Sequence, residues 1–445
     1  MGKYQGYEKY KDSGVEWLGE IPEHWSINRL GRLTEEINDI NHEMPVAVDQ
    51  GIPFLSAKDL LDDGTLNFEK DIKKIAEEDF IRLSKKICPK RNDIIYSRIG
   101  ACLGKARIVE VDIKFLVSYS CCVIRLRQEL ANPIFFKYFL DSELVLSEAR
   151  LRTQGIGVPD LGLKQISKFA TSVPPILEQI EIARFLDYKT KQIDDLIAKK
   201  EALIEKLDEK RTALISHAVI KGLDPSVPMK DSGIEWLGEI PEHWKRGKLN
   251  YFCQIISGGT PDRNNPDFWE GDIPWVKTGE VNYQDIYSTE EYITKEGLNS
   301  SSTTLVKPET LLMAMYGQGY TRGRVAILKI EAAFNQACLG ISPLSNLNIY
   351  FLYYYLISAY KYIRDTGNES SQMNLSAGLI GKISILIPHL EAQQQIVKFL
   401  DQKTNEIDQQ KAKIKEAIEL LKEYRTSLIT NAVTGKIDVR QVPIP

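Results

Sequence analysis

The sequence predicts a mixed α/β (α+β) fold: two globular domains separated by two long helices that form an antiparallel coiled coil, with a pseudo-two-fold, circular organisation. Three observations support this prediction. A fifteen-residue stretch occurs twice, two long segments carry apolar residues at a seven-residue spacing, and two other segments have strand–turn–strand patterns. Internal repeats of this kind are typical of an architecture built from copies of one unit.

Length and composition set the broad class of the protein. A chain of 445 residues is too long for one ordinary core and predicts two to four domains. Hydrophobic residues make up 43% and charged residues 27%, as in globular proteins outside membranes. The apolar stretch at 349–360 is too short and too rich in Tyr to span a bilayer, so it predicts a buried helix and no membrane contact.

Charge, cysteine content and the N-terminal sequence concern partners and location. The net charge is −4, so a nucleic-acid-binding face must be locally basic on an acidic remainder. The six cysteines include no CxxC pair, which fits neither a disulfide framework nor a zinc site. The N-terminal segment lacks the charged, apolar and small-residue order of a signal peptide. We therefore expect a cytoplasmic, reduced protein.

The repeated stretch reads KDSGVEWLGEIPEHW at 11–25 and KDSGIEWLGEIPEHW at 230–244, identical at 14 of 15 positions. Trp17, Leu18, Ile21 and Trp25 supply apolar area for docking, and Pro22 keeps the preceding residue extended. A catalytic role for Glu23 or His24 is the less favoured alternative. We predict that each copy joins the end of a long helix to the next globular domain.

Two helical segments, 173–224 and 387–438, align at a constant offset of 214 residues. An apolar column with seven-residue spacing predicts a seam for a partner helix, and Lys200 is its one polar member. Packing of each helix on its own domain is the alternative. From Asp187 to His217 the first helix would have about 31 residues and a length of about 46 Å. The predicted seam residues are Leu186, Ile193, Leu207, Leu214, Leu400, Ile407, Ile414, Leu421 and Leu428.

The order of these parts predicts a closed cycle that is cut at one point. The first helix is followed by a linker and the second fifteen-residue copy, whereas the second helix is followed by the end of the sequence. Residues 1–25 should therefore lie beside the C-terminal end, as 230–244 lie beside the end of the first helix. The predicted divisions are a first globular domain at 1–173, a helical region at 174–224, a second globular domain at 225–387 and a helical region at 388–445.

The globular domains share a framework but differ in content. Segments 93–111 and 310–330 each have the pattern strand, Gly-rich turn, strand, which predicts a hairpin with a long tip. Arg and Gln can contact base edges and Lys can neutralise phosphate, whereas ordinary solvated surface charge is the alternative. The candidate DNA-binding residues are Arg98, Lys105, Arg107, Lys277, Tyr316, Gln318, Tyr320, Arg322 and Arg324.

Three segments are similar to catalytic motifs, but none has the complete pattern. GACLGKA at 100–106 is shorter than a P-loop and ends in Ala where Ser or Thr would hold magnesium. NPDF at 265–268 has Asp where amino-methyltransferases have a second Pro. Pro159–Asp160 with DYK at 187–189 is similar to a magnesium-nuclease signature, but Asp187 is expected to begin the first long helix. The sequence predicts no catalytic residue and no metal site.

The chain resembles the DNA-specificity subunit of Type I restriction–modification systems over essentially its whole length. The resemblance rests on the repeated DSGxEWLGEIPEHW stretch, on SGGTPDRNNPDFWEGDIPWVKTGEV at 257–281, on MAMYGQGYTRGRVAIL at 313–328, and on FNQACLGISP at 334–343. The LEQIEIARFLD-type entry to each helix adds to it. The first half departs from the family pattern, because it has no counterpart of SGGTP and its hairpin is shorter.

The resemblance implies two target-recognition domains, each recognising one half of a split, asymmetric site in double-stranded DNA. It implies that the long helices act as a spacer and as a docking surface for two methyltransferase subunits, which would bring S-adenosylmethionine. Restriction/translocase subunits that use ATP and Mg would join them, and this chain would bind no cofactor and catalyse nothing itself. The alternative is a non-catalytic scaffold whose two domains bind proteins. A solitary methyltransferase or nuclease is disfavoured, because the motifs for cofactor and metal are missing from the sequence.

Overall fold

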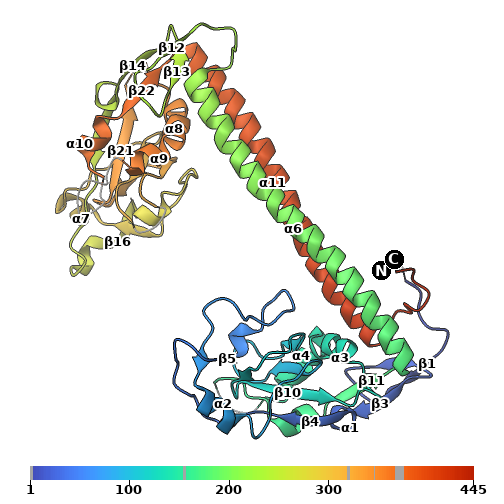
Figure 1. Ribbon diagram of the computed structural model, residues 1–445. Coiled ribbons are helices and arrows are strands. Elements are labelled where there is room, and N and C mark those ends of the chain that lie inside the picture. The colour runs from blue at the N-terminus through green and yellow to red at the C-terminus, as the bar shows by residue number, and fades with distance from the viewer. Residues whose placement is uncertain (1–3, 154–156, 318–320, 345, 366–374, 445) are drawn as a thin grey trace. The chain divides into compact units, whose positions relative to one another are not determined.

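The computed structural model describes residues 4–153, 157–317, 321–344, 346–365 and 375–444. The chain forms two compact units (Figure 1). Unit 1 comprises residues 1–200 and 415–445, and unit 2 comprises residues 201–414. Each long helix therefore contributes one part to each unit. The domain boundaries predicted at 173, 224 and 387 divide the chain at the ends of the helical segments instead, and they stay a prediction.

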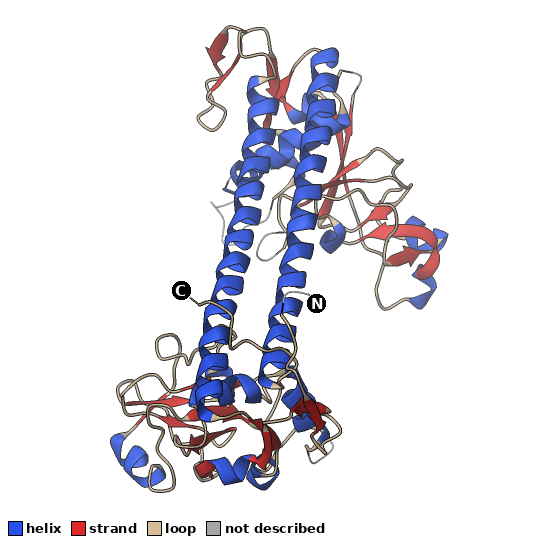
Figure 2. Cartoon of the chain, turned by 90° about the vertical axis from the view of Figure 1, so that its right-hand side faces the viewer, coloured by secondary structure: helices blue, strands red, loops and turns tan. Residues whose placement is uncertain are grey.

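Unit 1 contains short strands and helices that precede the first long helix, α6, in the chain. Figure 2 distinguishes the helices, strands and loops of the chain by colour. Its strands are β1 Tyr10–Asp12, β2 Glu20–Pro22, β3 Ser26–Arg29, β4 Thr34–Asn38, β5 Ile52–Leu55, β6 Lys74–Ile75, β7 Ile94–Ser97, β8 Ala106–Ile108, β9 Leu116–Val117, β10 Cys121–Leu126 and β11 Ala170–Val173. Its helices are α1 Leu30–Leu33, α2 Glu77–Leu83, α3 Pro133–Leu140, α4 Glu143–Leu151, α5 Leu163–Ser167 and the first part of α6 Ile176–Lys221.

Unit 2 repeats this order of elements between the two long helices. Its strands are β12 Met229–Asp231, β13 Glu239–Pro241, β14 Lys245–Lys248, β15 Cys253–Ser257, β16 Trp269–Val276, β17 Glu291–Ile293, β18 Leu311–Ala314, β19 Val325–Ile327, β20 Ala333–Phe334, β21 Cys338–Pro343 and β22 Ser384–Ile387. Its helices are α7 Lys295–Asn299, α8 Ile349–Ser358, α9 Tyr360–Asp365, α10 Ala377–Gly381 and the first part of α11 Leu390–Val433.

The sheets of the two units have the same topology. A four-stranded antiparallel sheet has the order β4-β10-β7-β8 in unit 1 and β15-β21-β18-β19 in unit 2. A three-stranded sheet has the order β6-β5-β9 in unit 1 and β17-β16-β20 in unit 2, and each contains one parallel pair. The structure therefore confirms the prediction of a mixed α/β chain with two repeated domains. Both predicted hairpins, β7–β8 and β18–β19, are present.

Each fifteen-residue copy folds into the same small hairpin. In unit 1 Lys11 on β1 pairs with Ile21 on β2, and in unit 2 Lys230 on β12 pairs with Ile240 on β13. Leu18, Ile21 and Trp25 are 2%, 0% and 0% exposed, which confirms that this stretch supplies apolar area for packing. The hairpin therefore docks through its apolar side chains and leaves its charged ones at the surface.

The N-terminal and C-terminal segments meet in unit 1, as the cyclic organisation predicts. The amide of Asp438 donates to the carbonyl of Gln5 at 2.8 Å, and Ser172 Oγ donates to the carbonyl of Val433 at 2.8 Å. Each long helix is followed by a glycine with positive φ: Gly222, directly after α6, at 80°, and Gly435, two residues after α11, at 73°. The left-handed conformation favours glycine and stops a helix. The repeated tryptophan of the same unit then packs on each of these glycines.

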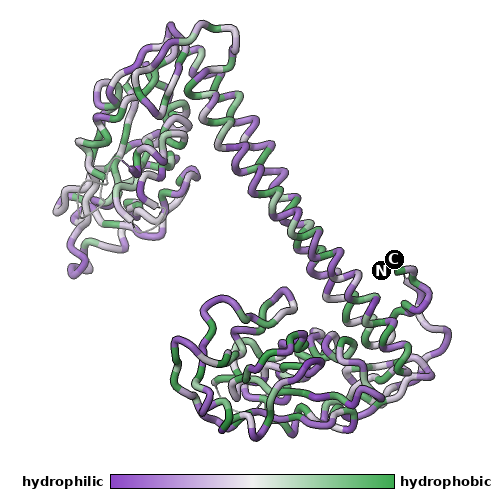
Figure 3. The backbone as a smooth tube through the Cα atoms, in the orientation of Figure 1, coloured by the Kyte–Doolittle hydropathy of each residue, from purple (hydrophilic) through white to green (hydrophobic). Residues whose placement is uncertain are grey.

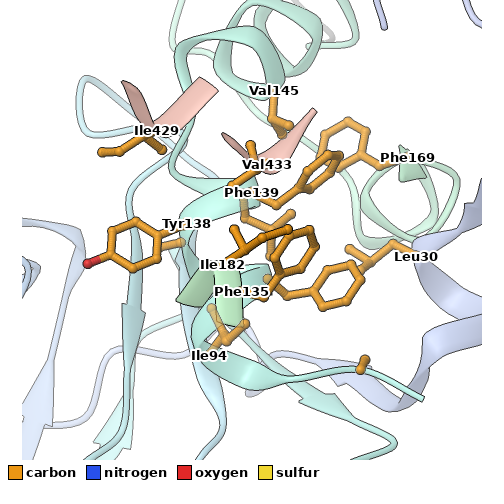
Figure 4. Close-up of a cluster of buried hydrophobic side chains, with 14 of the residues drawn as sticks. Leu30, Ile94, Phe135, Tyr138, Phe139, Val145, Phe169, Ile182, Ile429 and Val433 are labelled. Atoms are coloured by element: carbon orange, nitrogen blue, oxygen red, sulfur yellow. The ribbon is translucent and has the colours of Figure 1, made fainter. Parts of the chain in front are cut away.

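The core of unit 1 brings together side chains of the four-stranded sheet, of helix α3 and of both long helices, among them Ile94, Ile182 and Val433 (Figure 4). Helix α3 begins at Asn132, whose side chain accepts from the amide of Phe135, and Pro133 occupies its first turn. Phe135 and Phe139 of this helix pack with Ile182 of α6, and all three are 0% exposed. In unit 2 the apolar stretch at 349–360 forms the buried helix α8 with α9 after it, so the prediction of a buried helix is confirmed.

The two long helices are longer than predicted. Helix α6 has 46 residues and α11 has 44 residues. Asp187 lies within α6 and does not begin it, so that prediction was wrong. The turns before Asp187 pack on the globular core through Ile182 and Phe185, and these contacts extend the helix beyond its seven-residue column. Figure 3 shows hydrophilic and hydrophobic residues alternating along both helices, as amphipathic helices require.

The nine predicted seam residues are all removed from solvent at least in part. Leu186, Ile193, Leu207, Leu400, Ile407 and Leu428 are buried, and Leu214, Ile414 and Leu421 are half-buried. In unit 1 the core cluster contains seam residues of both helices, Leu186 and Ile193 of α6 and Leu428 of α11. In unit 2 Leu400 of α11 belongs to the core, and Leu214 of α6 packs against it.

Charged side chains also link α6 and α11 inside each unit. In unit 1 Arg425 donates to Asp194 at 2.9 Å. In unit 2 Arg211 lies 3.6 Å from Asp408, and Lys411 pairs with Asp208. Across the described parts of the chain, no helix combines the length and the apolar composition needed to cross a membrane.

Candidate nucleic-acid interface

The β7–β8 hairpin of unit 1 is antiparallel, with Tyr96 paired to Ala106, and its ends carry three of the predicted DNA-binding residues. Arg98 follows β7 directly, Lys105 precedes β8, and Arg107 lies within β8. The strands are rich in β-branched residues, and β7 is buried on both faces. The hairpin therefore holds these three side chains on a rigid base.

All three basic side chains of this hairpin pair with carboxylates. Arg98 donates to Asp39 and to Asp160, each at 2.7 Å, and its side chain is 4% exposed. Arg107 donates to Asp141 at 2.9 Å and is also 4% exposed. These two guanidinium groups fix the hairpin to neighbouring loops, because breaking a buried ion pair leaves an uncompensated charge. Their direct contact with DNA stays a prediction.

Lys105 is the most accessible of the three. Its side chain is 28% exposed and lies 2.6 Å from Asp62, which is itself 92% exposed. The hydrogen bond from Lys105, together with its charge, lowers the pKa of the Asp62 carboxyl from its ordinary value. Such an exposed pair contributes little to stability, so Lys105 is able to exchange the Asp62 carboxylate for a phosphate or for solvent.

The β18–β19 hairpin of unit 2 presents a different chemistry. Arg324 donates to the side-chain oxygen of Asn282, and its guanidinium lies 5.6 Å from the centre of the Tyr283 ring. Arg364 lies 5.5 Å from the ring of Tyr360, and the two tyrosine rings are 6.1 Å apart. We call Tyr283, Arg324, Tyr360 and Arg364 the tyrosine–arginine cluster. Burial raises the pKa of the Tyr283 hydroxyl, which therefore stays protonated near neutral pH.

Two further predicted residues of this hairpin are described and two are not. Arg322 is 6% exposed and donates to the carbonyl of Arg364 at 3.1 Å, so it joins the hairpin to α9. Tyr316 is 37% exposed at the start of the tip. Gln318 and Tyr320 lie outside the described residues. The structure thus places Arg324 beside two tyrosine rings, a combination that can stack on bases and donate hydrogen bonds. Arg322 is buried, and its direct contact with DNA stays a prediction.

Lys277 stands apart in its contacts from the hairpin residues. It follows β16 of the three-stranded sheet, and its ammonium group lies 2.7 Å from Glu290 and 3.2 Å from Glu291. Hydrogen bonds to these two carboxylates raise the pKa of Lys277. Its position beside two acids gives no sign of an anion site, and a DNA contact for it stays a prediction.

The groups similar to catalytic motifs have structural partners. Asp160 accepts from Arg98, whereas Asp187 accepts from the Tyr138 hydroxyl at 2.8 Å. Asn265 caps a short 3₁₀ turn at 266–268. A β-strand, β8, follows GACLGKA, as the rejection of a P-loop expected. Among the described residues, no three of His, Cys, Asp or Glu are grouped as metal ligands would be.

The buried cysteines are poor nucleophiles. Burial raises the pKa of the thiols of Cys121 and Cys338 to about 12. It raises the pKa of Cys253 to about 12 as well. The thiolate is the reactive form, so these side chains are inert near neutral pH.

Sequence reasoning missed a pair of glutamines, each of which ties a long helix to the globular part of its own unit. Gln179 and Gln393 are each 0% exposed at the start of the long helices. Gln179 accepts from the amide of Asn132 at 2.8 Å, and Gln393 accepts from the amide of Asn348 at 2.7 Å. Each also donates to two backbone carbonyls of its own unit. The signal was available, because the two glutamines coincide at the offset of 214 residues.

A second repeated contact anchors the long helices to the globular domains. The hydroxyl of Tyr138 on α3 donates to Asp187 at 2.8 Å, and that of Tyr354 on α8 donates to Asp401 at 2.7 Å. Both aspartates belong to the repeated LD pair of the helical segments. The structure therefore assigns these carboxylates to packing and not to catalysis.

Comparison with known proteins shows which family has this repeated architecture. The family model described as "Type I restriction modification DNA specificity domain" matches residues 35–206 and 241–420. The MjaVIII specificity subunit of Methanocaldococcus jannaschii is 26% identical over 437 residues, covering 95% of each chain. The HindI specificity subunit of Haemophilus influenzae is 23% identical, over 78% of this chain and 87% of that one.

Solved structures share the fold at lower identity. One, from a study of "complex assembly and conformational transition of the type I R-M system", superposes with a TM-score of 0.72 at 15% identity, covering 93% of this chain and 98% of that chain. The HsdS subunit from Thermoanaerobacter tengcongensis has a TM-score of 0.56 at 16% identity, covering 94% of this chain and 98% of that one.

Proposed function

Because the chain belongs to the Type I restriction–modification DNA specificity family, we propose that its two units each recognise one half of a split, asymmetric DNA site. The observation that carries this proposal is the contrast within the repeat. Both units keep the same sheets, caps and glutamine contacts, while their hairpins present different side chains. A shared scaffold with different hairpins is what the recognition of two different base sequences requires.

The tyrosine–arginine cluster is the proposed recognition surface of unit 2, and the buried Arg322 positions the hairpin that carries Arg324. Arginine donates to guanine edges in the major groove, and tyrosine hydroxyls and rings contact phosphates and bases. In unit 1 the proposed surface lies around Lys105 and Asp62 at the end of the β7–β8 hairpin. Arg98 and Arg107 then position that hairpin through their buried ion pairs.

We further propose that α6 and α11 pair as an antiparallel coiled coil that sets the unread gap between the half-sites. The interhelical ion pairs support this, because position 194 pairs with 425 and position 211 pairs with 408. Partner numbers fall as α6 numbers rise, as antiparallel helices require. The burial of the nine seam residues supports it as well.

Deleting one heptad from each long helix tests the spacer proposal. Seven residues correspond to about 10 Å of helix and therefore to about three base pairs. The gap in the methylated site should shorten by about three base pairs while both half-sites stay the same. A gap that keeps its length would overturn the spacer proposal but leave recognition by the two units standing.

The catalytic work is proposed to lie on partner subunits. The chain would dock two methyltransferase subunits, which carry S-adenosylmethionine, and through them restriction/translocase subunits that use ATP and Mg. This chain would bind no cofactor itself and act in the cytoplasm. The buried cysteines and the structural roles of Asp160 and Asp187 support a non-catalytic chain.

The test is long-read sequencing of modified adenines in cells that carry this chain with its neighbouring methyltransferase. The expected result is one bipartite motif that disappears when this chain is deleted. Arg324→Ala should weaken methylation through the unit 2 half-site, while Lys361→Ala on the same unit serves as a surface control. No chain-dependent motif, together with DNA binding that is insensitive to salt, would favour the protein-binding scaffold instead.

A further inference from the structure

The joint between the N-terminal segment and α6 in unit 1 is closed by one aromatic side chain. Tyr7 is 7% exposed, and its hydroxyl donates to Glu178 at 2.6 Å. The Trp25 indole N–H donates to the same carboxylate at 3.1 Å, and His24 Nε2 lies 2.8 Å from it. The ring of Tyr7 lies 5.8 Å from that of Trp25. These four residues form what we call the closed junction.

Among the described residues, the equivalent joint in unit 2 has no ring in the place of Tyr7 and no carboxylate in the place of Glu178. His243 and Trp244 correspond to His24 and Trp25 in the repeated stretch. Ala392 stands where Glu178 stands, at the offset of 214 residues. A cavity of about 130 Å³ lies there, bordered by Trp244, Ala392, Ile396, Lys221 and His243 among others. We call this cavity the open slot.

The path of the chain explains why the slot is open. Unit 1 has two segments at its joint, the N-terminal one and the C-terminal one, which are linked by the hydrogen bond from Asp438 to Gln5. Unit 2 has a single linker, 222–228, which turns directly from Gly222 into the second hairpin and leaves Ser226 exposed. No second segment of the linker is available to supply the ring that Tyr7 supplies in unit 1.

The chemistry of the open slot specifies what fits it. Trp244 is 4% exposed, and Ala392 stands where Glu178 accepts from the tryptophan indole N–H in unit 1. Lys221 and His243 add further donors at the edge. An engineered apolar cavity of about 150 Å³ holds benzene, and the open slot, at about 130 Å³, is slightly smaller. The slot therefore suits an aromatic side chain with an acidic or other hydrogen-bond acceptor beside it.

We propose that the open slot seats an aromatic side chain of a methyltransferase subunit, so that the two joints of this chain dock their partners unequally. The inference rests on the proposed function, which supplies the methyltransferase partner. A polypeptide occupant is favoured because an extended segment of this chain, around Tyr7, fills the same place in unit 1. The donors at Lys221, His243 and Trp244 favour a segment with an acidic residue next to the ring.

Filling the slot tests the proposal in the assembled complex. Ala392 is half-buried in the first turn of α11, so Ala392→Phe adds a ring without disturbing the core, and Ala392→Ser is the matched control that keeps the cavity. Native mass spectrometry of the chain co-expressed with its methyltransferase gives the affinity of each binding step. Ala392→Phe should weaken one step about tenfold or more and leave the other unchanged. Two unchanged steps would overturn the proposal.

A cross-linking experiment does not depend on the stability of that variant. A photoreactive p-benzoylphenylalanine replaces Gln395, an exposed residue that borders the open slot. The matched position is Glu181, which is exposed and occupies the same place beside the closed junction. An adduct with a methyltransferase peptide that contains an aromatic residue is expected from Gln395 and not from Glu181. No adduct from Gln395, or equal adducts from both, would overturn the proposal.

The outcomes separate this inference from the proposed function. If the native chain binds two methyltransferase subunits and Ala392→Phe binds them equally well, docking stands and the slot has no part in it. If the native chain binds no methyltransferase, the docking proposal falls and this inference falls with it. A loss confined to one binding step, with an unchanged melting temperature of the variant, supports both.

Discussion

In unit 1 the side chain of Gln179 accepts from Asn132 and donates to the carbonyls of Leu130 and Pro174. In unit 2 Gln393 makes the same three contacts, with Asn348, Asn346 and Pro388. The two units thus agree at the level of single hydrogen bonds where they meet the long helices. Buried backbone groups need partners, so these contacts tolerate little change.

The same two units differ in their β-hairpins and at their joints. The hairpin of unit 1 pairs Arg98, Lys105 and Arg107 with carboxylates, whereas the hairpin of unit 2 sets Arg324 beside an amide and an aromatic ring. The joint of unit 1 is closed by Tyr7, whereas that of unit 2 is open. The comparison shows that the two units keep one framework where they meet the long helices and differ in their hairpins and joints.

Breaking the shared framework should give the largest effect. Gln179→Leu and Gln393→Leu each remove three hydrogen bonds made by a fully buried amide, so each should lower the free energy of unfolding of its own unit by about 3 kcal/mol. Hydrogen exchange of the α3 and α8 peptides measures the two units separately. Gln394→Leu, at the exposed neighbour of Gln393, is the control and should change little. A large loss in only one unit would show that the two frameworks are not equivalent.

Removing the indole N–H at the two joints should sharpen the contrast between them. Trp25→Phe breaks the hydrogen bond to Glu178 and should cost about 1.5–3 kcal/mol, because a buried carboxylate loses a donor. Trp244→Phe loses no such bond and should cost less than half as much. Hydrogen exchange of β2 and β13 measures both. Equal losses would contradict the role given to Glu178, and adding Ala392→Glu should make Trp244→Phe more costly.

The hairpins should differ in how their arginines act. Arg324→Ala should weaken binding of DNA that contains the unit 2 half-site by about tenfold, because a base-edge contact is worth about 1–3 kcal/mol. Arg107→Ala should first speed hydrogen exchange in β7 and β8, since its guanidinium holds Asp141. Fluorescence anisotropy at several salt concentrations measures the affinities. An Arg324→Ala variant that binds its half-site normally would exclude this residue from recognition.

The interhelical ion pairs should give the smallest effects. Double-mutant cycles on Arg425–Asp194 and on Arg211–Asp408 should yield coupling energies of about 0.2–1 kcal/mol, because both pairs are partly exposed. The first pair should be the stronger, since its closest atoms are 2.9 Å apart and those of the second are 3.6 Å apart. Thermal unfolding at low and high salt measures both. A larger coupling energy for Arg211–Asp408 than for Arg425–Asp194 would show that the atomic separations do not rank the two pairs.

Part of the candidate site could be predicted from local sequence patterns, and the rest depends on contacts between residues far apart in the chain. The hairpins were predictable because strand and turn signals are local in the sequence. The burial of Arg98 and Arg107 was not, because their partners Asp39, Asp160 and Asp141 lie far away along the chain. The true start of α6 was not predictable either. Its first turns are held by the globular core, and the seven-residue column does not record that packing.

The sequence by itself determined the repeat, the cyclic order of parts and the apolar columns of the long helices, because these are periodic properties of the chain. Only the tertiary structure decided which joint is closed and which is open. The fifteen-residue stretches are almost identical, so the difference arises from what packs beside them: Tyr7 and Glu178 in unit 1, a short linker and Ala392 in unit 2. A cavity is a property of neighbours brought together in space, and no single stretch of sequence contains it.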